Sequence, residues 1–167
     1  MQGVELLPEH FHEVVSRYWQ RLTEHPEFSQ ELRQLLEQDT QFSQELMRVW
    51  VASDFAANSI VTHPALLRVL HARRREPAPE YTERLRQQVS GIAGQDYKSG
   101  AEGLKKALRI FHRTEYLLIL WRDICAIQDV HGICRQMSDL ADAALEITLE
   151  TLNRWSCAEW GEPRNGD

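Results

Sequence analysis

The stretch LKKALRIFHRTEYLLILWRDICAI, residues 104–127, decides the fold class of this sequence. Its apolar residues recur every three or four positions, and at about 100° per residue they fall on one broad face of an α-helix. These residues are Leu104, Ala107, Leu108, Phe111, Leu118, Trp121 and Cys125. A strand at YLLILW is a weaker alternative, because the helical spacing continues on both sides of it. We therefore predict one long helix over 101–127.

A second long helix is predicted over 129–156, where Asp129 is a candidate N-cap. Its apolar side chains follow a heptad-like stripe made of Ile133, Met137, Leu140, Ala141, Ala144, Leu145, Thr148, Leu152 and Trp155. Because the connection between the two helices is only a few residues long, we expect them to pack antiparallel.

Proline and glycine residues divide the rest of the chain into shorter segments. Apolar spacing predicts helices from Pro8, after Pro26, over 40–61, after Pro64 and over 80–92. The arginine- and proline-rich segment 72–80 and the glycine-rich segment 91–103 are predicted loops. The expected fold is therefore all-α: a bundle of about six helices in one subdomain, residues 1–156, followed by a linker over 157–167.

Composition narrows the class of protein further. The longest apolar run has six residues, whereas a membrane-spanning helix needs about 20, and the first residues lack the features of a secretory signal. Three cysteines form no disulfide framework, which favours a reducing, cytoplasmic location. The acidic pI of about 5.7 argues against nucleic-acid binding. We expect neither a membrane nor a nucleic acid as a partner.

No catalytic motif is evident in the sequence. Phosphate-binding glycine loops, a nucleophile elbow and paired metal-binding histidines are all absent. Asp139 and Asp142 are close on a helix, but such a pair is usually a solvated face. We assign no catalytic, cofactor-binding or metal-binding residue to this sequence.

Two groups of charged residues on the 101–127 helix attract interest. Lys105, Arg109 and Arg113 form a stripe with Lys106 at its edge, and like charges at this spacing repel unless something neutralises them. The stripe is a candidate interaction surface, or else it faces acidic helices of the same fold. Glu115 and Arg122 are seven residues apart and are predicted to form a partly buried, structural ion pair with each other or with neighbours.

Four stretches, in this order, resemble the glutamine synthetase adenylyltransferase family. The first, VWVASDFAANSIVTHPALLRVL (49–70), resembles the family's S-D-F…HP…L segment through Ser53, Asp54, Phe55, His63 and Pro64. The second, residues 104–127, resembles its L-R-x-F-x-R helix and W-R-D continuation through Leu108, Arg109, Phe111, Arg113, Trp121, Arg122 and Asp123. MSDLADAALEITLETL (137–152) resembles its L-S-x-L-A-D-A helix, and CAEWGEPRN (157–165) resembles its W-G-x-P linker.

The resemblance implies a bifunctional enzyme of nitrogen regulation. One half attaches AMP from ATP to a tyrosine of glutamine synthetase, and the N-terminal half removes it by phosphorolysis, giving ADP. The resemblance also implies Mg²⁺ and ATP or ADP as cofactors, and glutamine synthetase and the P-II signalling protein as partners. The family's G-G…D-x-D active site would follow Asp167, in a nucleotidyltransferase domain. The chain alone is therefore expected to be inactive and to support the adenylyl-removing domain.

Two alternatives stay open at this point. The chain could be a free-standing helical protein-interaction module without enzymatic activity. A small helical enzyme with an unrecognised site is the third possibility, and the absence of nucleophile, metal and phosphate motifs makes it the weakest.

Overall fold

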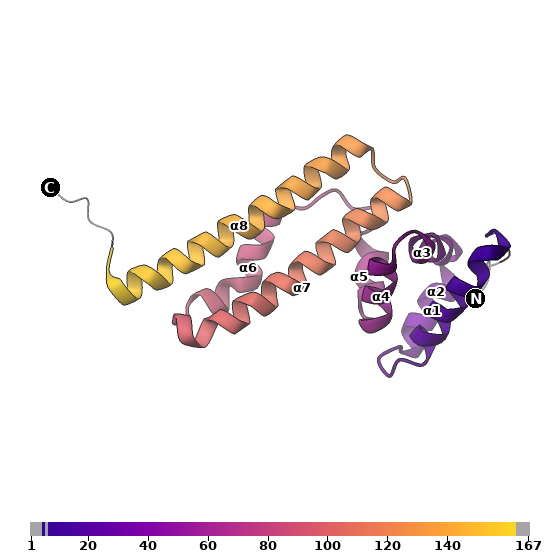
Figure 1. Cartoon of the computed structure of the whole chain (residues 1–167), viewed down its shortest axis with the longest axis horizontal. Helices are drawn as coiled ribbons and strands as arrows, with labels where there is room; N and C mark the ends of the chain where they lie inside the picture. The colour runs from indigo at the N-terminus through magenta and orange to yellow at the C-terminus, as the bar shows by residue number, and fades with distance from the viewer. Residues whose placement is uncertain (1–4, 6, 163–167) are drawn as a thin grey trace. The chain divides into compact units, whose positions relative to one another are not determined.

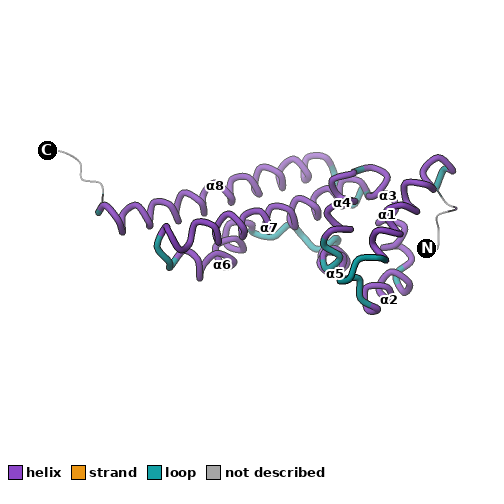
Figure 2. The backbone as a smooth tube through the Cα atoms, turned by 60° about the horizontal axis from the view of Figure 1, so that its bottom comes forward, coloured by secondary structure: helices purple, strands orange, loops and turns teal. Residues whose placement is uncertain are grey.

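The computed structural model describes residue 5 and residues 7–162, and every regular element in this part of the chain is a helix (Figures 1 and 2). The predicted all-α fold is confirmed. The elements are η2 (Glu9–Phe11), α1 (His12–Thr23), α2 (Gln30–Gln38), α3 (Thr40–Ala52), α4 (Asp54–Thr62), α5 (Leu66–Arg73), α6 (Tyr81–Ala93), α7 (Tyr97–Ile124) and α8 (Val130–Trp160). The two long predicted helices correspond to α7 and α8.

Contacts within the chain gather into two compact units. Unit 1 comprises Met1–Glu76 with Leu117–Ile133, and unit 2 comprises Pro77–Tyr116 with Cys134–Asp167. The sequence predicts a single helical subdomain over 1–156, so the division differs from that expectation. The boundary between the units falls inside α7 and α8, because the end of α7 and the start of α8 belong to unit 1 and the rest of both helices belongs to unit 2.

Unit 1 is built around a large aromatic and aliphatic core. Trp50 and Trp121 are fully buried, and the Phe42 ring stacks on Trp121 with 5.1 Å between ring centroids. Helix α1 adds Val15, Tyr18 and Leu22 to this core, at the helical spacing expected of an amphipathic helix.

The helix predicted over 40–61 is interrupted at Ser53. Its backbone is extended there (φ −148°, ψ 109°), and its side chain accepts a hydrogen bond from the Ala56 N–H. Serine is a preferred N-cap because its oxygen satisfies an N–H group that the first turn leaves unpaired. The segment therefore forms two helices, α3 and α4.

Unit 2 contains α6, the part of α7 up to Tyr116 and the part of α8 from Cys134. Helices α6 and α7 run antiparallel, because Arg84 lies by Glu115 and Ile92 lies by Gly103. Helices α6 and α8 run in the same direction, because Thr82 bonds to Glu146 and Ala93 bonds to Arg154. The start of α7 meets the end of α8, where Tyr97 packs edge-on against Trp155.

The predicted loop over 91–103 is mostly helical. Only Gly94–Asp96 separates α6 from α7, and the Ser99 N–H donates to the Asp96 carboxylate at the start of α7. The glycines serve close packing instead of a loop: a Cβ on Gly100 would lie 2.6 Å from the Trp155 ring. A lone glycine in a helix costs about 1 kcal/mol in propensity, which a tight helix–helix contact can offset.

The predicted linker over 157–167 also begins later than expected. Helix α8 continues to Trp160 and ends at Gly161, which adopts a left-handed backbone conformation (φ 85°). Glycine terminates helices in this way because it lacks a Cβ. The remainder of the predicted linker, from residue 163 onward, lies outside the described residues.

Candidate interaction surface

The four cations that the sequence predicts as an interaction surface lie together on α7, within unit 2. Lys105, Lys106 and Arg109 are exposed, and Arg113 is half-buried. We call these four residues the basic face of α7. The other side of the helix is buried through Leu104, Ala107 and Phe111.

Within the described residues, only one ion pair neutralises the basic face. The Lys105 Nζ lies 2.7 Å from Glu102 Oε1, one turn earlier on the same helix. This hydrogen bond raises the pKa of Lys105 above its usual value and lowers the pKa of Glu102. Both side chains are exposed, so solvent screens the pair and its contribution to stability is small. The positive charge of the other three cations faces solvent without an ion pair in this part of the chain.

Another basic residue of unit 2 does pair with acidic side chains of its own and of a neighbouring helix. Arg86 on α6 lies 3.1 Å from Glu83, 3.4 Å from Glu146 and 3.0 Å from Glu150. The alternative interpretation of the charge pattern, pairing inside the fold, therefore holds for this arginine of α6. The basic face of α7 is distinct, because its single ion-pair partner among the described residues, Glu102, lies on its own helix.

Glu115 and Arg122 are both almost completely buried, at 2% exposure each. The Glu115 carboxylate lies 3.6 Å from Arg84 Nε in unit 2. Arg122, in unit 1, donates to three backbone carbonyls at 3.1–3.2 Å, those of Arg73, Arg74 and Glu76. The contacts of each residue are structural, and their predicted pairing with each other stays a prediction.

Sequence reasoning missed a buried charge network in unit 1. Glu45 on α3 is 4% exposed, and its Oε2 accepts hydrogen bonds from Arg74 Nε (3.0 Å) and Trp121 Nε1 (3.1 Å). Arg74 also donates to Asp39 at 2.8 Å, and His71 lies 3.1 Å from the same carboxylate oxygen. We call Asp39, Glu45, His71 and Arg74 the buried network of unit 1. It holds the end of α5 against α3 and α7.

The network corrects the prediction that 72–80 is simply an exposed loop. Residues 72 and 73 complete α5, and Arg74 is only 7% exposed because Asp39 and Glu45 neutralise it. A signal was present in the sequence. Glu45 stands between Phe42, Leu46 and Val49, so helical spacing places a carboxylate on the buried side of α3, where it requires a cation.

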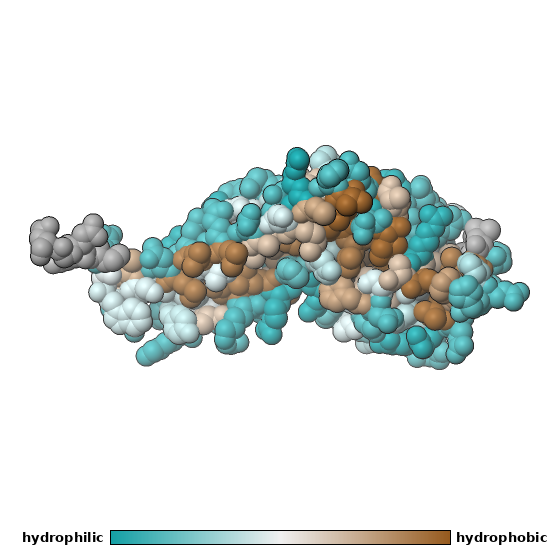
Figure 3. Space-filling model, turned by 45° about the horizontal axis from the view of Figure 1, so that its top comes forward, coloured by the Kyte–Doolittle hydropathy of each residue, from teal (hydrophilic) through white to brown (hydrophobic). Residues whose placement is uncertain are grey.

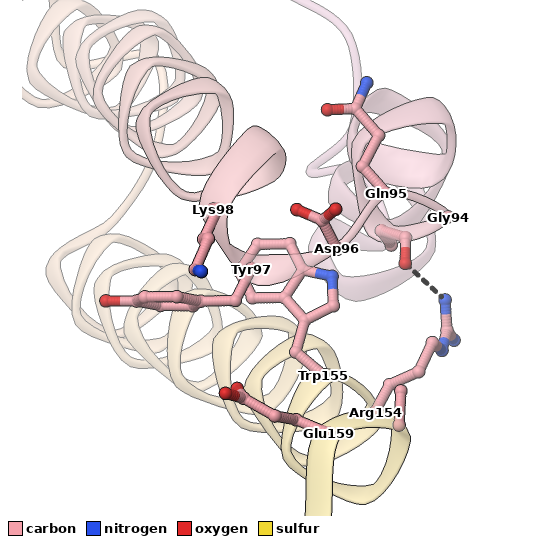
Figure 4. Close-up of a pocket in the computed structure, with 10 residues that line it drawn as sticks. Gly94, Gln95, Asp96, Tyr97, Lys98, Arg154, Trp155 and Glu159 are labelled. Atoms are coloured by element: carbon pink, nitrogen blue, oxygen red, sulfur yellow. Dashed lines mark hydrogen bonds between the residues drawn. The ribbon is translucent and has the colours of Figure 1, made fainter.

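A pocket of about 520 Å³ opens in unit 2 where α6 ends, α7 begins and α8 ends. Figure 4 shows Tyr97 and Trp155 in this pocket, with Asp96, Lys98 and Glu159 around them. Trp155 is 4% exposed, and its indole N–H has no hydrogen-bond partner among the described residues. The Arg154 guanidinium donates to the Ala93 carbonyl at 3.5 Å and so caps α6. Acidic and basic side chains both line the pocket, so its charge indicates no particular class of ligand.

Groups suited to metal or thiol chemistry are scarce in the described part of the chain. No cluster of three or more His, Cys, Asp or Glu side chains could hold a metal ion there. Burial, together with the Glu45 carboxylate, raises the pKa of the Cys125 thiol to about 12, which makes it a poor nucleophile at neutral pH. None of the described helices is both long and apolar enough to cross a membrane.

Comparisons with known proteins place this geometry in a family. The chain is 32% identical over 120 residues to the bifunctional glutamine synthetase adenylyltransferase/adenylyl-removing enzyme of Pseudomonas aeruginosa, covering 72% of this chain and 12% of that protein. It is 25% identical over 166 residues to the protein of the same name from Hahella chejuensis, covering 97% of this chain and 16% of the relative. It is 31% identical over 134 residues to the protein of the same name from Nitrosococcus oceani, covering 75% of this chain and 13% of the relative.

The chain thus spans less than a fifth of the length of these relatives. A search of solved structures finds no significant match. The family profile described as glutamate-ammonia ligase adenylyltransferase matches residues 43–167, which include the basic face of α7 and the whole of α8. The resemblance seen in the sequence is confirmed, and the chain belongs to the glutamate-ammonia ligase adenylyltransferase family.

Proposed function

We propose that this chain is the helical region of an enzyme that adenylylates and deadenylylates glutamine synthetase and thereby controls nitrogen assimilation. Its relatives carry both activities in their names, and they are several times longer than this chain. In this proposal the helical region supports the adenylyl-removing domain. The basic face of α7 helps to dock glutamine synthetase, the substrate protein.

The reaction proposed for the intact enzyme is a pair of group transfers. In adenylylation, a tyrosine hydroxyl of glutamine synthetase attacks the α-phosphorus of ATP, pyrophosphate leaves, and AMP stays attached to the tyrosine oxygen. In adenylyl removal, inorganic phosphate attacks the adenylyl phosphorus, the bond to the tyrosine oxygen breaks, and ADP and the unmodified tyrosine side chain form. Mg²⁺ and the nucleotides belong to the intact enzyme, and we assign no step of either reaction to a described residue of this chain.

One observation supports a docking role above all: three exposed or half-exposed cations of the basic face lack an ion pair in the described chain. They lie on a regular helix whose opposite side is buried in unit 2, so the helix sets the spacing of these side chains and the side to which they project. Arranged charges of this kind accelerate and orient the encounter with a protein of complementary potential.

The test uses the intact enzyme with adenylylated glutamine synthetase as substrate. Arg109→Glu should raise KM for that substrate about fivefold and leave kcat unchanged, because rim charges act on association. Arg135→Glu is the matched control, since Arg135 is exposed on α8 and the change in charge is the same. The loss should shrink as salt screens the charges. An unchanged KM for Arg109→Glu would reject the docking role.

The proposal also covers the location and the regulation of the enzyme. We infer a cytoplasmic enzyme whose two activities respond to the P-II signalling protein, with this region taking no part in binding a membrane or nucleic acid. The chain alone should neither transfer nor remove AMP. Either activity in the purified 167-residue chain would contradict this proposal and favour a small helical enzyme.

A free-standing interaction module is the competing function. It predicts that the gene product ends near Asp167 and that no nucleotidyltransferase sequence follows. Intact-mass analysis of the native protein separates the two: a product several times longer supports the enzyme, and a product of about 19.5 kDa supports the module.

A further inference from the structure

Helix α8 carries a second apolar face that the fold does not use. Leu145 and Leu149 are 63% and 65% exposed, and Met137 and Leu152 are 37% and 39% exposed. At about 100° per residue, these four side chains occupy one sector of the helix. We call them the apolar stripe of α8. Figure 3 shows apolar side chains gathered along the surface to which α8 contributes.

The three leucines of the stripe lie apart from the side of α8 that packs inside unit 2, and Met137 borders that side. That side buries Leu140, Ala143, Ile147 and Thr151. Charged residues of α8, such as Glu146 and Glu150, lie on a third side, where they pair with Arg86. Between Met137 and Leu152, the residues that share the sector of the stripe are Ser138, Ala141 and Thr148, which are uncharged.

A helix with two apolar sides is typical of a buried position, with neighbours on both of them. Unit 2 supplies α6 and α7 for one side. Exposed apolar patches of this kind mark contact surfaces, because water is displaced from them favourably on association. The stripe therefore has the character of an interface that the described chain leaves open.

We propose that the apolar stripe of α8 is the surface on which the remaining polypeptide of the full-length enzyme packs. The inference rests on the proposed function, in which this chain is one region of a longer protein. The relatives carry several times more polypeptide than the matched region, so a large intramolecular partner is available. Helix α8 extends to Trp160, so the stripe lies on a regular helix that continues beyond Leu152.

A second copy of this chain fits the stripe less well. A self-associating helix would continue the spacing of Leu145, Leu149 and Leu152 along a seam. The preceding seam positions are Ser138 and Asp142, and a carboxylate there would face its own copy across the interface. The stripe is apolar for too short a distance to form a stable two-stranded coiled coil.

Hydrogen–deuterium exchange on the unmodified proteins is the first test. The backbone amides of 145–152 should exchange at least tenfold more slowly in the full-length gene product than in the 167-residue chain. Amides of 44–50, in the core helix α3, serve as the internal reference and should exchange alike in both proteins. Equal exchange over 145–152 would overturn the proposal, as would a gene product that ends near Asp167.

A pair of substitutions gives an independent readout. Leu149→Gln should lower the Tm of the full-length protein and leave the Tm of the 167-residue chain unchanged, since the side chain is already exposed there. Glu150→Gln, on the neighbouring position, is the control and should affect both proteins alike. A 167-residue chain that is dimeric by light scattering and becomes monomeric with Leu149→Gln would assign the stripe to a second copy instead.

These readouts do not involve glutamine synthetase. A normal KM for Arg109→Glu together with protection of 145–152 would therefore remove the docking role of α7 and keep the interface on α8. The reverse result would remove the interface alone.

Discussion

Unit 1 and unit 2 each bury a carboxylate, Glu45 and Glu115, but they differ in the side chains that they leave exposed. Unit 1 buries charge: Glu45 and Arg74 lie beneath the surface and satisfy each other and Trp121. Unit 2 leaves its basic face and its apolar stripe exposed to solvent. A buried charge has to be paired within the fold, whereas an exposed cation or leucine stays available to a partner. Both of the proposed contact surfaces therefore lie in unit 2.

The largest effect should come from breaking the buried network of unit 1. Glu45→Ala leaves Arg74 with one carboxylate fewer and the Trp121 N–H without its acceptor. Removing one partner of a buried ion pair costs about 3–5 kcal/mol of the free energy of unfolding. Urea denaturation of the chain measures this loss. Glu37→Ala, at an exposed position on α2, is the control and should change stability by less than about 0.5 kcal/mol.

The rate at which each cysteine is alkylated provides a second comparison of the two units. Burial raises the pKa of Cys125 in unit 1 from 9.0 to about 12, whereas Cys134 in unit 2 is exposed. A rise of three units lowers the thiolate fraction about 1000-fold, and the thiolate is the nucleophile. Iodoacetamide at pH 8, followed by peptide mass mapping, should therefore label Cys134 first. Similar rates for both thiols in the folded chain would contradict the buried position of Cys125, and urea should equalise them.

Two glycines test the packing of unit 2. Gly100→Ala places a Cβ 2.6 Å from the Trp155 ring, and overpacking of this kind costs about 1–3 kcal/mol. At Gly91, on α6, an added Cβ meets nothing within 4 Å. Gly91→Ala should therefore stabilise the chain by up to about 1 kcal/mol through helix propensity. Urea midpoints of the two variants should move in opposite directions, and a shared direction would refute the close contact.

The smallest expected effect is on the stability of the fold at low pH. Burial alone would raise the pKa of Asp39, but hydrogen bonds from the Phe42 N–H and from Arg74 hold it below its ordinary value of 3.8. Since the folded state favours the ionised form, this contribution is complete above the ordinary pKa and disappears as pH falls through the folded value. The stability difference between wild type and Asp39→Asn should therefore shrink below about pH 4. A difference in urea midpoint that is constant from pH 6 to pH 2 would contradict this.

Glu83 in unit 2 provides the matching surface measurement. Hydrogen bonds from Gln87 and Arg86 lower the pKa of Glu83, and this side chain is exposed. Salt screens an exposed pair much more than a partly buried one. The acid-dependent difference between wild type and Glu83→Gln should therefore shrink more in 1 M NaCl than that between wild type and Asp39→Asn.

Local patterns in the sequence were sufficient for the helices and for the basic face. Apolar residues three and four positions apart predict α7 and α8 because burial of one helical side requires that spacing. Lys105, Lys106 and Arg109 are exposed and Arg113 is half-buried, since the apolar side of the same helix determines where they point. Ser53 shows where local patterns were ambiguous, because a serine inside an apolar helix pattern can be either an interior residue or a cap.

Two predictions made from composition were wrong, one for a glycine and one for an arginine. Glycine at 100 favours a loop by propensity, but the nearby Trp155 ring makes it the residue that allows close packing. Arg74 looked like part of an exposed linker, but Asp39 and Glu45, about 30 residues earlier, neutralise and bury it. In both cases the contact that determines the conformation or the burial comes from residues distant in sequence. The spacing of nearby residues therefore cannot predict it.

By itself, the sequence determined that this protein is helical, that α7 presents cations on one side, and that the chain resembles an adenylyltransferase family. Those properties depend on residue spacing and on residue identity along the chain. Only the tertiary structure decided which apolar residues of α8 are buried. Leu140 and Trp155 pack inside unit 2, whereas Leu145 and Leu149 stay exposed, although all four are equally suited to a core. The physical reason is that burial depends on which neighbours reach each side of a helix.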